Sequence, residues 1–232
     1  MTALPLAGDP AALWYLNRAT GLVLLALFSL ALLLGQLATA RTRSELVPRF
    51  LTLELHRNIT LVALSLLAVH VLTSVLDSYV DISPLDVVVP LRSPYRPVWL
   101  GLGTLALDVL IAIVLTTAVR HRLARSGWRT VHYLAYLAWP LAVLHGLGTG
   151  TDTRSQLTLL VTLGCVTLVV LGLLVRISTA QGVNHAARAA AAFVVVLVPL
   201  LASVWLRSGP LQPDWSRRAG TPPPASSTGG TK

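Results

Sequence analysis

The chain has 232 residues, of which 54% are hydrophobic and only 12% are charged. Soluble proteins carry about 25% charged residues, and the mean hydropathy of this chain is +0.72. This composition excludes a disordered chain and a nucleic-acid-binding protein, and it predicts an integral membrane protein whose main partner is the lipid bilayer. The single cysteine, Cys165, excludes an internal disulfide and every multi-cysteine metal or iron–sulfur motif.

Six apolar stretches follow one another along the chain. A helix needs about 20 apolar residues to cross a hydrocarbon core of about 30 Å. The stretches that meet this length are 13–37, 53–76, 98–119, 131–149, 157–176 and 187–206. Each is predicted to be helical because lipid offers no partner to free backbone groups. The predicted fold class is therefore all-α, a polytopic membrane bundle of six transmembrane helices.

The chain divides into a bundle and a tail. Residues 1–207 contain the six apolar stretches and form one membrane domain. Residues 208–232 are rich in Pro, Gly, Ser and Thr and cannot bury an apolar face. They are predicted to be a disordered tail.

The distribution of basic residues predicts the orientation. The net charge of +9 comes from 18 Lys and Arg against 9 Asp and Glu, and short cytoplasmic loops usually hold such a surplus. The first, third and fifth loops carry nine arginines against three in the second and fourth. These nine are Arg41, Arg43, Arg49, Arg120, Arg122, Arg125, Arg129, Arg176 and Arg188. The prediction is a multi-pass protein of the cell membrane with both termini outside, although the basic residues of the tail disagree.

Four of the six histidines lie in two of the predicted spans. His56 and His70 are fourteen residues apart in the second span, and His132 and His145 are thirteen apart in the fourth. At 1.5 Å per residue these separations are about 21 Å and about 20 Å. One span lies between them, so the two run in the same direction. His56 and His132 are therefore expected at the inner depth, and His70 and His145 at the outer depth.

Two imidazoles at one depth on facing helices are the ligand set of a haem iron with two axial ligands. One metal cannot bind all four rings, because nitrogen–metal bonds are only about 2 Å long. The pattern therefore predicts two b-type haems, one in each leaflet. A thirteen-residue separation leaves His132 and His145 about 140° apart around an ideal helix. We expect the helix to be distorted at Pro140, which lies between them, so that both rings face the same side.

The same residues resemble the ferric reductase-like transmembrane domain superfamily. An H-x13-H span is followed by an H-x12-H span that ends at His145–Gly146, and the segments NRATGLVLL and WRTVHYLAYLA add to the likeness. This superfamily includes NADPH oxidases, ferric-chelate reductases and the haem-binding membrane subunit of the methionine sulfoxide reductase system. The resemblance covers about residues 14–176. It implies that His56 pairs with His132 on an inner haem and His70 with His145 on an outer haem.

The resemblance also implies a function in electron transfer. Oxidases and ferric reductases continue into a flavin and nicotinamide domain, whereas this chain has no G-x-G-x-x-G fingerprint. FAD or FMN and NAD(P)H would therefore act only through a partner, a cytoplasmic flavoprotein or another electron donor. The expected protein is an oxidoreductase component that passes electrons to ferric iron, oxygen or an external redox partner. The alternatives are a haem-binding subunit serving an external reductase, or a histidine-based proton or metal transporter.

Five further residues have both a functional and a structural interpretation, and no catalytic residue is predicted. Arg18 either binds an outer haem propionate or extends to the membrane surface. Arg57 and Arg129 either bind inner propionates or simply mark the cytoplasmic side. Trp139 lies at a depth between the two haems, where it shortens the electron gap or packs in the core. Asp108 either accepts a ring N–H from a ligating histidine or is a satisfied buried polar group.

Overall fold

The computed structural model describes residues 10–39, 48–77 and 80–222, which form helices, turns and irregular segments without any strand. The helices are α1 Pro10–Thr39, α2 Arg49–Leu76, η2 Pro84–Val87, α3 Pro97–Ala118, η3 Arg120–Arg122, α4 Arg125–Tyr133, α5 Ala135–Thr149, α6 Gln156–Ser178, α7 His185–Ser208 and α8 Trp215–Arg218. Local chemistry sets several of these boundaries. Pro97 occupies the first turn of α3, and the side chains of Ser155 and Asn184 accept backbone N–H groups at the starts of α6 and α7. The prediction of an all-helical fold is confirmed for these residues.

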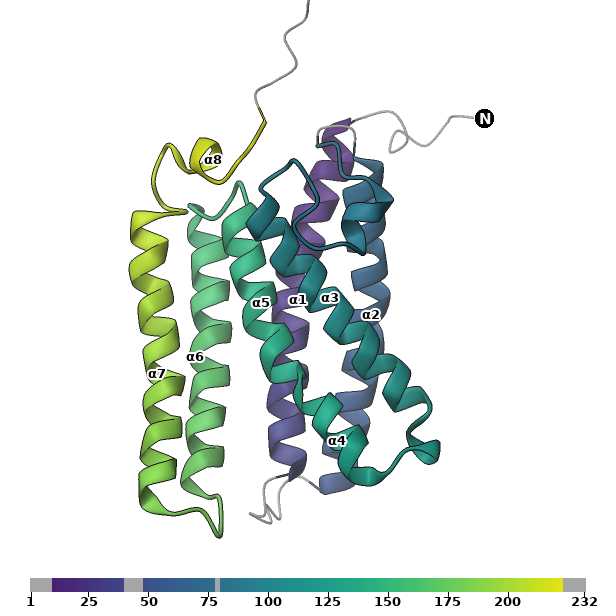
Figure 1. Ribbon diagram of the computed structural model, residues 1–232, viewed down its shortest axis with the longest axis vertical. Helices are drawn as coiled ribbons and strands as arrows, with labels where there is room; N and C mark the ends of the chain where they lie inside the picture. Colours follow the sequence, from purple (N-terminus) through teal and green to yellow (C-terminus); the bar gives the residue numbers. More distant parts are fainter. Residues whose placement is uncertain (1–9, 40–47, 78–79, 223–232) are drawn as a thin grey trace, which may run out of the picture.

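The long helices stand side by side in one bundle (Figure 1). α1 is the central helix and packs against α2, α5 and α6, while α3 packs against α4 and α5. α7 packs against α6 at the edge of the bundle and has no buried residue. The start of α1 and the end of α7 lie at the same end of the bundle, drawn at the top of Figure 1. We call this the upper end.

Five helices in the described ranges are long and apolar enough to cross a membrane: α1, α2, α3, α6 and α7. They match five of the six predicted spans to within a few residues. The remaining prediction, 131–149, falls on two helices, α4 and α5, which are separated by a single residue, Leu134. Neither reaches the length of a spanning helix, because α5 has 15 residues and α4 has 9.

The distortion between His132 and His145 lies at Leu134 and not at Pro140. Leu134 has φ −61° and ψ −13°, and its N–H donates to the carbonyl of Val131, one residue closer than in an α-helix. Pro140 lies inside α5, which continues on both sides of it. The prediction of a distortion in this segment is thus confirmed, but its position at Pro140 is wrong. A tight turn at Leu134 redirects the chain, whereas the missing N–H of Pro140 removes one bond without ending the helix.

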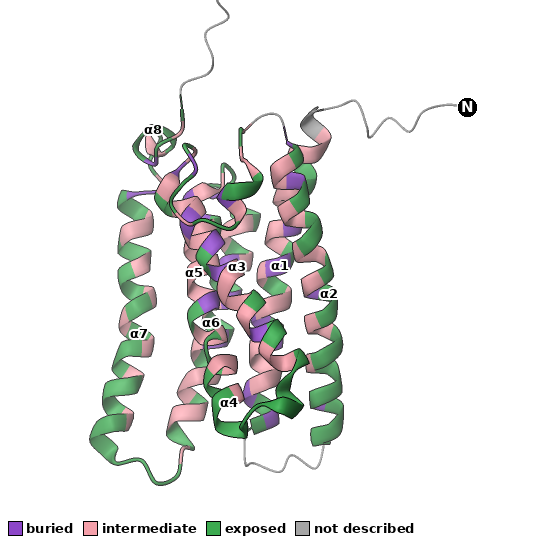
Figure 2. Cartoon of the chain, turned by 45° about the vertical axis from the view of Figure 1, so that its right-hand side comes forward, coloured by how far each residue is buried: buried purple, intermediate pink, exposed green. Residues whose placement is uncertain are grey.

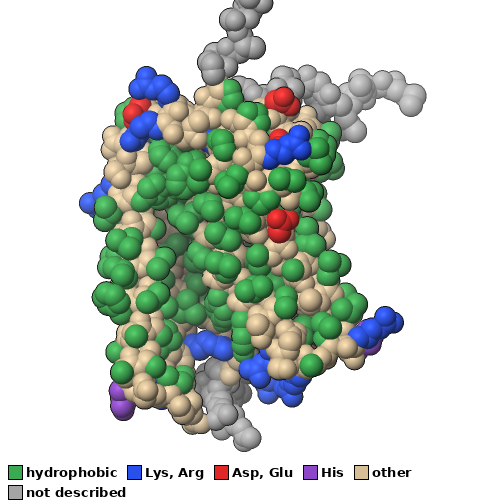
Figure 3. Space-filling model, viewed as in Figure 1, with side chains coloured by type: hydrophobic (Ala, Val, Ile, Leu, Met, Phe, Trp, Pro, Cys, Tyr) green, Lys and Arg blue, Asp and Glu red, His purple; other side chains and the backbone are tan. Residues whose placement is uncertain are grey.

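Side-chain size increases from the inside of the bundle to its outside. The buried positions of the helices are mostly small residues (Figure 2), among them Thr20, Ser29, Ala31, Ala63, Thr104, Ala106 and Ala138. Large apolar side chains, chiefly Leu and Val, are exposed along the helices and cover the waist of the molecule (Figure 3). Helix interfaces made of small residues, with large apolar side chains on the outside, are expected of a bundle surrounded by lipid.

The first part of the predicted tail is folded. Residues 209–222 turn back over the upper end of the bundle and include α8 (Figure 1). Trp215 of α8 packs against Trp99 with tilted rings and against Trp205 edge to face. This aromatic packing holds a segment that composition alone marks as disordered. The rest of the predicted tail, 223–232, lies outside the described residues, as do Arg41 and Arg43 of the first loop.

Candidate functional site

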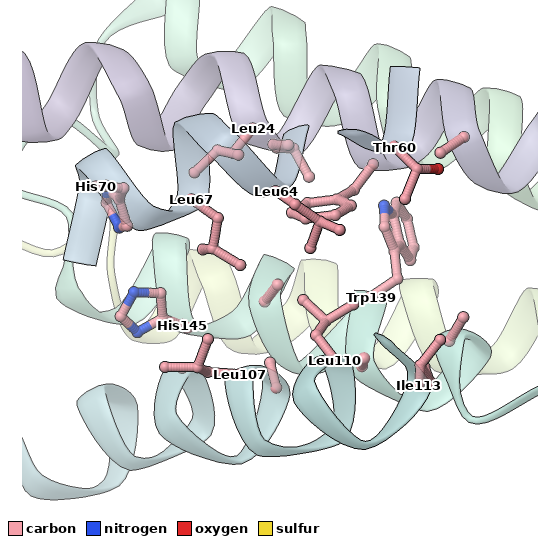
Figure 4. A pocket seen from close by; sticks show the side chains of 18 of the residues that line it. Leu24, Thr60, Leu64, Leu67, His70, Leu107, Leu110, Ile113, Trp139 and His145 are labelled. Atoms are coloured by element: carbon pink, nitrogen blue, oxygen red, sulfur yellow. The ribbon is translucent and has the colours of Figure 1, made fainter. Parts of the chain in front are cut away.

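A cavity of about 1690 Å³ lies among α1, α2, α3, α4 and α5 and is lined by all four predicted histidines. Most ligand pockets in proteins are about 300–1,000 Å³, so this cavity has room for more than one ordinary ligand. It exists because α2 packs along α1 and stands apart from α3, α4 and α5. Its walls between the histidines are mainly leucines (Figure 4), which favour an apolar ligand.

Three of the four histidine rings are fixed by the same contact. The Nδ1 atoms of His56, His70 and His145 lie 2.8, 3.0 and 3.0 Å from backbone carbonyl oxygens. A carbonyl can only accept, so Nδ1 carries the proton in each ring and donates it. Each Nε2 atom therefore keeps its lone pair free, which is the tautomer that binds a metal. The accepting carbonyls belong to Ala31, Asn17 and Trp99 respectively.

A glycine lies four residues after each accepting carbonyl. A Cβ atom on Gly21 would approach the ring of His70 to 3.2 Å, one on Gly35 that of His56 to 3.5 Å, and one on Gly103 that of His145 to 2.5 Å. The absence of a side chain lets each imidazole lie against the backbone of the neighbouring helix. Gly21 and Gly35 on α1 are fourteen residues apart, as are His56 and His70 on α2. The equal spacing lets each glycine lie opposite one histidine, Gly21 opposite His70 and Gly35 opposite His56.

His132 is held differently. Its ring stacks on Trp128 of the same helix with ring centres 5.2 Å apart, and its Nδ1 atom is buried without a hydrogen-bond partner. Trp128 is itself fixed by a 3.2 Å bond from its Nε1 to the hydroxyl of Thr117. The position of the His132 ring is thus set by stacking on an aromatic neighbour.

His56 and His132 form the lower pair of rings. Their centres are 6.2 Å apart and their planes differ by 72°. Two imidazoles that bind the same metal atom have ring centres about 6 Å apart, since each nitrogen–metal bond is about 2 Å long. The distance therefore fits one metal atom between the rings, as the predicted inner pairing requires.

His70 and His145 form the upper pair, and they lie across the cavity from one another at one end of the view in Figure 4. His70 comes from α2 and His145 from α5. No group of three or more His, Cys, Asp or Glu side chains gathers in the described residues to hold a metal ion. The donor set is thus two separate pairs of imidazoles in an apolar cavity, which suits a planar metal cofactor bound from both faces.

Arg18 lies at the upper mouth of this cavity. Its guanidinium forms an ion pair with the carboxylate of Asp152 and lies 4.3 Å from the centre of the Trp14 ring. Its Nε atom is buried without a partner. The side chain is 16% exposed, so it points into the protein and not along the surface, and it retains a donor for a further acidic group.

Arg57 and Arg129 both line the lower part of the cavity and are exposed. One guanidinium nitrogen of Arg129 donates to the hydroxyl of Tyr133 at 2.9 Å. Both arginines lie within four residues of a histidine of the lower pair, Arg57 next to His56 and Arg129 three before His132. Their placement is compatible with both interpretations that the sequence offered.

Trp139 lies in the cavity between the levels of the two histidine pairs. Its Nε1 donates to the hydroxyl of Ser29 at 2.9 Å, which ties α5 to α1 at this level. In Figure 4 leucine side chains, among them Leu64 and Leu67, separate it from His70 and His145. The ring thus fills the middle of the cavity, as its sequence position indicated.

Asp108 takes no part in this site. It does not line the cavity, and within the described residues it has no hydrogen-bond or ion-pair partner. The ring N–H groups of His56, His70 and His145 go to backbone carbonyls, so the interpretation of Asp108 as their acceptor is wrong. Its interpretation as a satisfied buried polar group is wrong too, because the residue is only partly buried and its carboxylate has no such partner among the described residues.

The sequence analysis missed the residues that hold the rings. The repeated fourteen-residue spacing of Gly21 and Gly35 was a usable signal, because it matches the spacing of His56 and His70. Trp128, four residues before His132, was another, since side chains at this spacing meet on one helix face. The role of Gly103 had no such signal, because it depends on the packing of α3 against α5.

Comparison with protein families gives one match. Residues 12–152, more than half of the chain, match a family described as a domain of unknown function, DUF8596. The chain belongs to this family. The DUF8596 region contains α1 to α5 with all four histidines of the cavity, and α6, α7 and α8 lie beyond it. No curated protein and no solved structure matches the chain.

Proposed function

We propose that this protein is a di-haem b-type cytochrome of the cell membrane that transfers electrons from a cytoplasmic donor to an acceptor outside. We also propose, from the spacing of the histidines, that the chain is related to the ferric reductase-like transmembrane domains. In it, α4 and α5 together form the fourth of six membrane crossings. Their 25 residues, Arg125 to Thr149, rise about 37 Å at 1.5 Å per residue, enough to cross the bilayer despite the turn at Leu134.

The observation that carries the proposal is the hydrogen bonding of the histidine rings. Three imidazoles donate Nδ1–H to a backbone carbonyl and keep a free Nε2 in an apolar cavity. One such bond is enough for a histidine that only links helices, so what favours metal ligands is that the three rings line one cavity with a fourth histidine. Ligating histidines need one anchored N–H and one free lone pair, and this is the arrangement found at His56, His70 and His145.

Each pair of rings would hold one haem in this proposal. His56 and His132 would bind the inner haem, and His70 and His145 would bind the outer haem. Arg18 offers its unpaired Nε–H to a carboxylate at the outer mouth, while Arg57 and Arg129 offer guanidinium groups at the inner mouth. The planar guanidinium of arginine can donate two parallel N–H···O bonds to one carboxylate, which suits the propionates of the cofactor.

The haem iron supplies one-electron redox chemistry, and the protein sets its potential through axial ligands, burial and hydrogen bonding. The backbone carbonyls that accept Nδ1–H raise the basicity of His56, His70 and His145. Leucines give the cavity apolar walls, and Trp139 lies between the two levels. With two imidazoles on each metal no position is left for a substrate, so donor and acceptor are separate partners. A cytoplasmic flavoprotein is the proposed donor, and ferric iron, oxygen or an external redox enzyme the acceptor.

The test is a reduced-minus-oxidised absorbance spectrum of the purified protein with a haem assay. We expect b-type bands and about two haems per chain. His70→Ala should remove the outer haem and spare the inner one. His185→Ala, on an exposed residue at the start of α7 that does not line the cavity, should keep both. A colourless protein from haem-replete cells would contradict the proposal. Proton or metal flux through proteoliposomes containing such a protein would identify a histidine-based transporter instead.

A further inference from the structure

The segment 209–221, which we call the C-terminal strap, is bound at the upper end of the bundle to the two elements that hold His145. It follows α7, includes α8, and lies beyond the part of the chain that matches the family. At one side it meets the start of α3, and at the other the end of α5. These two contacts connect it to the site proposed above.

Arg96 is the main link between the strap and α3. It precedes α3, is only 2% exposed, and has a left-handed backbone with φ 43°. Its backbone N–H donates to the carbonyl of Gly220, and its Nε donates to the hydroxyl of Thr221 at 2.9 Å. Its NH1 group donates to the carbonyls of Gly148 and Thr149 at 2.9 and 3.0 Å. One buried guanidinium therefore joins the strap to the end of α5.

Trp215 of α8 is the second link. Its Nε1 donates to the carbonyl of Gly148 at 3.0 Å, and its ring lies 5.3 Å from that of Trp99 and 5.8 Å from that of Trp205. The ring of Trp99 is so close to Gly148 that a Cβ atom there would come within 2.4 Å of it. Trp99 is thus enclosed by α5 on one side and by Trp205 and Trp215 on the other.

Trp99 also supplies the carbonyl that accepts Nδ1–H of His145, at 3.0 Å. It is the third residue of α3, and the first turn of a helix is the part that frays most readily. The corresponding carbonyls for His56 and His70, those of Ala31 and Asn17, lie in the interior of the continuous helix α1. Of these three anchors, the one for His145 is at a helix end and needs outside support.

We infer that the C-terminal strap is a positioning device for the outer metal ligand: Trp215 and Arg96 hold Trp99 in place, and the Trp99 carbonyl holds the ring of His145. This inference rests on the proposed function. A firm Nδ1–H···O=C bond raises the basicity of the ligand and favours the oxidised metal. Loosening the strap should therefore move the potential of the outer haem to a more positive value and leave the inner haem unchanged.

The experiment compares Trp215→Ala, Trp215→Phe and Arg217→Ala in the full chain, by haem content and by redox titration followed spectroscopically. Trp215→Ala removes both the ring contacts and the N–H donor, so we expect a positive shift or a loss confined to the outer haem. Trp215→Phe keeps a smaller aromatic ring and loses the donor, so its shift should be smaller than that of Trp215→Ala. Arg217 lies two residues away on α8 and is exposed, so its replacement should change nothing.

The outcomes separate the inference from the function on which it rests. A wild-type protein without two haems overturns the proposed function itself. Two haems in the wild type with an unshifted outer haem in Trp215→Ala overturn the inference alone. Loss of both haems together in Trp215→Ala also overturns it, because the strap would then support the whole bundle and not the outer ligand.

Discussion

At the scale of single residues, the site depends on the absence of side chains as much as on their presence. An imidazole can donate to a main-chain carbonyl of a neighbouring helix only where the two backbones come close, and a glycine one turn further along permits this approach. Gly103 serves His145 in this way and Gly21, less tightly, serves His70, whereas a Cβ atom on Gly35 would make only an ordinary contact with His56. The carbonyl that each ring reaches fixes its Nδ1–H and leaves its Nε2 free.

The tightest of these contacts gives a test by substitution. In Gly103→Ala the new Cβ would lie 2.5 Å from Nδ1 of His145, so the ring must move away from the Trp99 carbonyl. We expect loss of the outer haem, with a fall in stability of about 1–3 kcal/mol from overpacking. The measurements are haem content and thermal unfolding in detergent.

Gly164→Ala is the matched control for that substitution. Gly164 lies inside α6 and does not line the cavity, and a Cβ atom there would meet nothing within 4 Å. Haem content should stay at the wild-type value. Retention of both haems in Gly103→Ala, or an equal loss in the two variants, would show that the glycine contact does not position His145.

At the scale of elements, the turn at Leu134 is what allows α4 and α5 to serve different levels of the cavity. His132 and His145 would point about 140° apart on one ideal helix. Because α4 and α5 are separate helices, each can present its histidine to the same cavity. Pro140 contributes little to this geometry, since α5 continues through it.

Replacement of Pro140 distinguishes the two positions for the distortion. Pro140→Ala supplies the missing N–H inside α5 and leaves Leu134 untouched, so we expect both haems to be retained. Stability should rise, by at most about 3 kcal/mol, the cost of proline in a helix interior. The measurements are the difference spectrum and the midpoint of thermal unfolding. If instead one haem is lost, the alignment of the histidines depends on Pro140.

At the scale of the whole molecule, the bundle has a part inside the family region and a part beyond it. α1 to α5 coincide with the family region and line most of the cavity, to which α6 adds Thr158, Thr162 and Arg176. α6 packs on α1, and α7 packs on α6. α7 contributes no buried residue of its own. It does return the chain to the upper end, where residues 209–222 fold over α3 and α5.

The predicted orientation is testable on the whole molecule by thiol labelling. In a Cys165→Ser background, Ser216→Cys places an exposed thiol on α8 at the upper end, and Arg122→Cys places one on η3 at the opposite end. A membrane-impermeant reagent should label Ser216→Cys in intact cells and Arg122→Cys only after permeabilisation. The opposite pattern would reverse the orientation and with it the direction proposed for electron transfer.

Several features could be predicted from the sequence because they depend on local composition or on regular helix geometry. The apolar stretches gave five of the long helices almost to the residue, since lipid leaves the backbone no alternative to a helix. Constant rise per residue placed His56 with His132 and His70 with His145, and all four line one cavity. The break at Leu134 and the folding of residues 209–222 could not be predicted in this way, because neither has a distinctive local sequence.

The order of hydrophobic segments and the heights of the histidines were thus determined by the sequence itself, through the length of a membrane crossing and the pitch of a helix. Only the tertiary structure decided which nitrogen of His56, His70 and His145 is anchored, and that the strap contacts Trp99. These contacts join residues far apart in the chain, such as Gly103 with His145 and Arg96 with Thr221. They depend on how closely two backbones approach, and no pattern along a single chain records that distance.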